Sequence, residues 1–70
     1  MSRNLSPWGM QCKRQMLELG KTYADIGAEI GRSRIYICQI VTGKSIPPQE
    51  MYDAISKALD VDPDLPKTVA

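Results

Sequence analysis

The side chains that could do chemistry in this chain are cations, amides and hydroxyls rather than groups that catalyse reactions or bind metals. Histidine, the usual general base and the commonest metal ligand, is absent from the 70 residues. The two cysteines, Cys12 and Cys38, are too few to build a structural zinc site without histidine, and they make a poor disulfide framework. No phosphate-binding glycine loop or nucleophile elbow occurs. We therefore expect no enzyme activity, no cofactor and no metal.

The cations are concentrated in the first two-thirds of the chain. Residues 1–45 hold seven basic and three acidic side chains, a net charge of +4, whereas residues 46–70 hold two basic and five acidic side chains, a net charge of −3. This asymmetry is typical of a molecule with one basic face and one acidic end. A solvated surface with accidental clustering would give the same counts.

The length allows one domain. We expect residues 1–70 to form a single unit with a core over about 7–65 and flexible ends at 1–5 and 67–70. A chain this short has a small core and little room for a deep cleft. Because no apolar run is long enough for a membrane helix and the N-terminus has no hydrophobic stretch, we expect a cytoplasmic protein.

The first helix is predicted over 7–19. Ser6 is a good N-cap, Pro7 suits the first helical position, and Gly20 is the expected left-handed C-cap. One face of this helix repeats at intervals of four, four and three residues, through Trp8, Cys12, Met16 and Leu19.

A short second helix is predicted over 23–30. Thr22 and Asp25 form a capping box at its start, and Gly31 ends it after barely two turns. The segment that follows gives conflicting signals. Ser33 can cap a helix over 34–42, but the β-branched and aromatic residues of this segment favour a strand. We predict a helix, because no second β-rich run exists to pair with a strand.

After an extended Ile46-Pro47-Pro48 linker, a fourth helix is predicted to open at Pro48. Its apolar stripe is formed by Met51, Tyr52, Ile55, Ala58 and Leu59. Residues 61–65 are expected to add one further helical turn, capped by Asp62 and ended by Pro66. The predicted fold class is thus all-α, a compact bundle of four to five short helices.

The spacing between the second and third helices predicts a helix-turn-helix. Gly27 leaves space for a close crossing of the two helices, and Gly31 can adopt the positive φ of a sharp turn. Ile37 and Ile40 would face inward and pack against the isoleucines of the second helix.

Over residues 8–65 the chain resembles the phage lambda repressor and Cro type of helix-turn-helix domain. The resemblance is carried by residues 22–44, the proline linker and Ala58-Leu59-Asp60-Val61. The sequence departs from the family pattern at Tyr23, where glutamine is usual, at Gly27, where alanine is usual, and at Val41, where glutamate is usual. The resemblance implies a sequence-specific regulator of transcription, either a repressor of the Cro kind or an activator, that binds double-stranded DNA. Because a domain of this size contacts few phosphates, we expect specific binding to need a homodimer.

In such a fold the helix over 34–42 would lie in the major groove with its N-terminal residues at the base edges. Arginine can pair with guanine, glutamine with adenine, and isoleucine can cover a thymine methyl group. The expected base-contacting residues are Arg34, Ile35, Tyr36 and Gln39.

Phosphate contacts would fix the register of the protein on the duplex. The free N–H groups at the start of the second helix, near Thr22 and Tyr23, form one anion site, and Ser33 offers another. The expected phosphate-contacting residues are Lys21, Thr22, Tyr23, Arg32, Ser33, Thr42 and Lys44. Cys38 is expected to be a partly exposed thiol with no role.

The dimer surface is expected at the C-terminal end, where Tyr52, Leu65 and Val69 are candidates if they are exposed. A second hypothesis is a protein-interaction module, because the outer side of the third helix carries Ile35, Tyr36 and Cys38. The N-terminal domain of cyanate hydratases, which serves assembly and not DNA reading, also resembles this stretch of the chain.

Overall fold

Local caps set the ends of the helices in the computed structural model, which describes residues 5–67. Four helices form within this range: α1 (Pro7–Leu19), α2 (Tyr23–Ile30), α3 (Arg34–Val41) and α4 (Gln49–Leu59). No strand is present between residues 5 and 67, so the all-α prediction is confirmed.

The predicted caps are found where they were expected. The Ser6 hydroxyl accepts a hydrogen bond from the backbone N–H of Gly9 at 3.0 Å. At the start of α2, Thr22 and Asp25 form the reciprocal capping box. The turn into α3 passes through Gly31, whose φ of 87° is accessible to glycine but strained for other residues.

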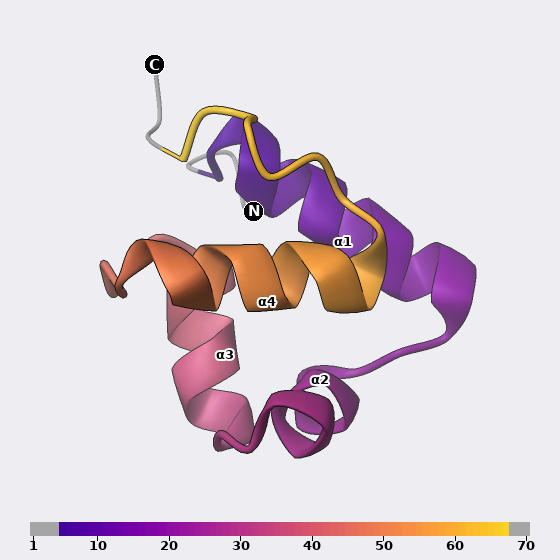
Figure 1. Cartoon of the computed structure of the whole chain (residues 1–70). Helices are drawn as coiled ribbons and strands as arrows, with labels where there is room; N and C mark the ends of the chain where they lie inside the picture. The colour runs from indigo at the N-terminus through magenta and orange to yellow at the C-terminus, as the bar shows by residue number, and fades with distance from the viewer. Residues whose placement is uncertain (1–4, 68–70) are drawn as a thin grey trace.

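The core lies where the four helices meet (Figure 1). α2 and α3 pack against each other as the two arms of a helix-turn-helix, and α1 and α4 close the core over them. Fully buried side chains come from all four helices: Trp8, Cys12, Ile26, Ile37, Ile40, Val41, Ile55 and Leu59.

The predicted inward face of α1 is wrong at its last member. Leu19 is 48% exposed, whereas Trp8 and Cys12 are buried and Met16 packs against the core. The reason is the position of the last turn of α1, which extends past the end of α4 in Figure 1.

The segment after α4 forms a turn and not a fifth helix. The Asp62 carboxylate accepts a hydrogen bond from the N–H of Asp64, and the N–H of Leu65 donates to the Asp62 carbonyl. This segment then runs beside the start of α1, where the Pro66 carbonyl accepts a hydrogen bond from Trp8 N–H at 3.0 Å. α4 itself begins one residue later than predicted, with Pro48 as its N-cap.

Two of the three residues suggested for the dimer surface pack against the core. Tyr52 meets the ring of Trp8 edge to face with 5.0 Å between centroids, and Leu65 is also half-buried against the core. Val69 lies outside the described residues. At the N-terminal end of the described residues, Leu5 is buried.

Candidate nucleic-acid interface

α3 begins directly after the sharp turn at Gly31 and is capped by Ser33. The Ser33 hydroxyl accepts a hydrogen bond from the N–H of Tyr36 at 3.2 Å. The cap therefore does not bind the N–H groups of Arg34 and Ile35, the first two residues of the helix. The inward side of α3 is fixed by the burial of Ile37, Ile40 and Val41. The opposite side of the helix must therefore face solvent.

Three predicted base-contacting residues lie on this outward side. Arg34, Ile35 and Gln39 are all exposed, with Ile35 exposed by 58%. Because residues four apart are neighbours on a helix surface, Ile35 and Gln39 lie next to each other. Neither the guanidinium of Arg34 nor the side-chain amide of Gln39 makes a hydrogen bond or ion pair with any residue from 5 to 67.

Tyr36, the fourth predicted base-contacting residue, lies elsewhere on α3. Its ring is half-buried and packs against the core. The guanidinium of Arg32 stands 5.6 Å from the centre of this ring, within the range of a cation–π contact. The structure thus groups Tyr36 with Arg32 rather than with Arg34 and Gln39.

The start of α2 combines free backbone donors with a closed capping box. Thr22 N–H donates to the Asp25 carboxylate at 2.9 Å, and Asp25 N–H donates to the Thr22 hydroxyl at 3.1 Å. Within residues 5–67 no acceptor is bound to the N–H groups of Tyr23 and Ala24, the next two along the helix. Unpaired N–H groups at a helix N-terminus attract anions.

The side chain of Tyr23 points away from solvent. Its hydroxyl is buried and has no hydrogen-bond partner among the described residues. Burial raises the pKa of Tyr23 to about 12, and the neighbouring thiol of Cys38 adds to the effect. Only the backbone of Tyr23 is therefore available to an anion in this conformation.

The remaining predicted phosphate contacts fall into two groups. Arg32, Ser33 and Lys44 are exposed around α3. Lys21 and Thr42 already bond to the protein: the Lys21 ammonium lies 2.9 Å from a Glu29 carboxylate oxygen, and the Thr42 hydroxyl donates to the Cys38 carbonyl at 2.7 Å.

Cys38 is half-buried, in agreement with the partly exposed thiol that the sequence predicted. It lies one turn after Arg34 and directly before Gln39, and its thiol neighbours the buried hydroxyl of Tyr23.

A family model of helix-turn-helix domains matches residues 13–65 of the chain. The chain belongs to the lambda repressor and Cro type of helix-turn-helix family. Membership in this family indicates a DNA-binding regulator. The match takes in all of α2, α3 and α4, so the side chains on the outward side of α3 lie within the family domain.

Neither a comparison with curated proteins nor a comparison with solved structures finds a significant match. Between residues 5 and 67, the helix-turn-helix domain has no helix with the length and apolarity needed to cross a bilayer.

Proposed function

We propose that the protein is a sequence-specific regulator of transcription that binds double-stranded DNA with α3 in the major groove. The observation that carries this proposal is the exposure of Arg34, Ile35 and Gln39 together on one side of α3, with the two polar groups unpaired in residues 5–67. Arginine can donate two hydrogen bonds to guanine, and glutamine can pair with adenine. A protein that regulates transcription must reach the duplex DNA of the cell, so the proposal includes a cytoplasmic location for this protein.

Phosphate contacts on both sides of α3 would hold it in register. The backbone N–H of Tyr23 at the start of α2 supplies one anion site, beside the capping residue Thr22. Further exposed donors surround the helix, namely Arg32, Ser33 and Lys44. Lys21 and Thr42 could reach phosphate only after giving up their bonds within the protein. Tyr36 contributes by packing against Arg32 rather than by reaching a base.

Specific binding at useful strength requires a homodimer. A single copy has a net charge near zero, so its nonspecific attraction to DNA is weak. The domain measures 30 × 25 × 21 Å, and successive half-sites of a palindrome are about 34 Å apart. Two copies can therefore lie side by side on one face of the duplex.

Binding-site selection from random duplex DNA, followed by titration of the selected site, tests this function. Arg34→Ala and Gln39→Ala should each cost about 1–3 kcal/mol of binding and relax the preference at one base position. Lys57→Ala and Gln49→Ala are the controls, because they remove an exposed cation and an exposed amide from α4. These controls should leave the base preference unchanged.

The 58% exposure of Ile35 favours a second candidate, a protein-interaction module that does not read DNA. Light scattering after size exclusion, with and without the selected duplex, separates the two candidates. A tight oligomer whose size changes neither with the duplex nor with Arg34→Ala would support the interaction module and contradict the regulator.

A further inference from the structure

α1 carries a second apolar stripe on the side opposite its core-facing residues. Met10 is 57% exposed and Leu17 is 86% exposed. Together with Pro7 and Arg14 they are spaced by three, four and three residues, which places them on one face of the helix. No other segment of residues 5–67 covers this stripe.

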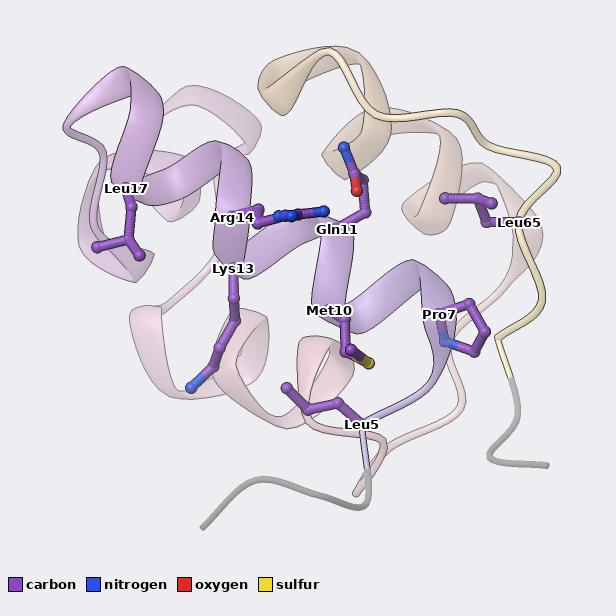
Figure 2. Close-up of a pocket in the computed structure, with 8 residues that line it drawn as sticks. All are labelled: Leu5, Pro7, Met10, Gln11, Lys13, Arg14, Leu17 and Leu65. Carbon is purple, nitrogen blue, oxygen red and sulfur yellow. The ribbon is translucent and has the colours of Figure 1, made fainter.

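The stripe forms the wall of an open groove with a volume of about 720 Å³ (Figure 2). Leu5, before α1, and Leu65, from the segment after α4, extend its apolar surface. No residue of α3 lines this groove, so it lies outside the predicted base-contacting surface. Two of its residues, Lys13 and Leu17, also line the adjoining pocket that contains Lys21, Thr22 and Tyr23.

The charges around the groove have one sign. Lys13 and Arg14 line it, and no acidic residue does. Neither cation forms an ion pair with a residue in the range 5–67. Glu18 is the only acidic residue of α1, and it lies outside the groove. Because burying an unpaired cation is costly, a partner that covers this surface is favoured when it supplies carboxylates.

A second copy of the chain does not meet this requirement. In a two-fold contact between two α1 helices, the register that covers Met10 with the partner copy's Leu17 brings Lys13 against the partner copy's Arg14. Like charges would then face each other at the centre of the contact. The groove is thus suited to a different protein.

We propose that this groove binds an acidic amphipathic helix of a partner protein. Apolar side chains of that helix would cover Met10 and Leu17, and its carboxylates would lie beside Lys13 and Arg14. The exposed stripe spans residues 7–17, which is about 15 Å of helix, enough for roughly three turns of a partner helix.

A synthetic amphipathic helix with leucines on one face and glutamates on both flanks is the probe for this proposal. A second peptide with lysines in place of the glutamates is its control. Calorimetry measures the affinity, and backbone amide NMR shifts of the full chain locate the site. The acidic peptide should bind, with shifts at the groove residues, and the basic peptide should not.

Charge reversal of the protein completes the test. Lys13→Glu combined with Arg14→Glu should weaken binding of the acidic peptide about tenfold and confer binding of the basic peptide. Leu17→Ser should also weaken binding. Lys57→Glu, a reversal on α4, should change neither affinity. All four substitutions are at side chains outside the core, and circular dichroism verifies the fold of each variant.

Three results would overturn the proposal. The first is equal binding of the two peptides, or binding of neither. The second is loss of duplex DNA binding in the charge-reversed variant with unchanged peptide binding, which would make the groove a phosphate contact. The third is self-association of the chain that Leu17→Ser abolishes, which would assign the groove to a second copy.

Discussion

The indole N–H of Trp8 donates a hydrogen bond of 2.8 Å to the hydroxyl of Ser56. Both residues are almost fully buried, at 1% and 2% exposure. The bond joins the start of α1 to α4 across 48 residues of sequence. It satisfies a polar group on each side of a small core, where an unpaired donor costs more than a hydrogen bond contributes.

Ser56→Ala should therefore lower the free energy of unfolding by about 1–3 kcal/mol, because it leaves the indole N–H of Trp8 buried without an acceptor. Urea denaturation measures the change. Trp8→Phe should cost less in the Ser56→Ala background than in the native chain, since the polar pair is then removed together. Ser45→Ala, at a half-exposed serine, is the control, and an equal loss there would contradict the argument.

Gly27→Ala should destabilise the protein by about 1–3 kcal/mol. A Cβ at this position would overlap the backbone carbonyl oxygen of Arg32, which cannot rotate away as a side chain can. Gly31→Ala is the comparison, because its Cβ would meet no atom within 4 Å and only the φ of 87° opposes it. That conformation costs about 1 kcal/mol.

Thermal and urea unfolding of these two glycine variants provide the measurement. The larger loss is expected at Gly27, although alanine is common there in the family. If Gly27→Ala is neutral or stabilising, the turn can open without loss and the close helix crossing does not constrain this position.

Protonation of Asp25 should weaken the domain at low pH. Hydrogen bonds from Thr22, first from its backbone and then from its side chain, hold the pKa of the Asp25 carboxyl below its ordinary value of 3.8. Since the folded pKa is the lower one, the stabilisation is fully present above the unfolded pKa and is lost as the pH falls through the folded pKa. The loss should therefore appear below about pH 4.

Asp25→Asn tests this origin of the acid sensitivity. The variant should melt at a lower temperature than the native chain at neutral pH and lose less on acidification, because the titrating group of the capping box is gone. Melting temperatures recorded from about pH 6 to about pH 2.5 give both slopes. Parallel slopes would assign the acid sensitivity to other carboxylates.

Substitution of Lys21 and substitution of Lys44 should affect DNA binding differently. This prediction rests on the proposed function. The Lys21 ammonium donates to the Ala58 carbonyl at 2.8 Å and pairs with Glu29, so it ties the start of α2 to the last turn of α4. Lys44 is exposed and makes no such side-chain contact within residues 5–67.

Lys21→Met should mainly reduce stability, by about 0.5–1.5 kcal/mol. Lys44→Met should leave stability nearly unchanged and reduce the slope of DNA affinity against salt concentration by about one. Titrations of the selected duplex at several salt concentrations measure the slopes. An equal change in slope for both variants would mean that Lys21 leaves Glu29 to bind phosphate.

The starts of α1, α2 and α3 and the ends of α1 and α2 are determined by the sequence itself. Ser6, Thr22 and Ser33 cap the helices with their own hydroxyls, and Gly20 and Gly31 take the left-handed conformation that ends them. These are interactions among residues within a few positions of one another, so they can be predicted without the rest of the fold.

The helix over residues 34–41 was predicted from the lack of a partner strand, and the tertiary structure gives the physical reason for it. Its β-branched residues favour a strand by a few tenths of a kcal/mol each. Burial of Ile37, Ile40 and Val41 against the other helices contributes about 1.5–3 kcal/mol for each side chain, which decides the outcome.

The tertiary structure also decided which side chains near the candidate interface are free. Sequence periodicity assigned Leu19 to the core and could not show that Lys21 pairs with Glu29 or that the Tyr23 hydroxyl is buried. Each of these outcomes depends on which distant element lies opposite the residue. Local spacing fixes the face of a helix on which a side chain lies, whereas the packing of the other helices determines what that face meets.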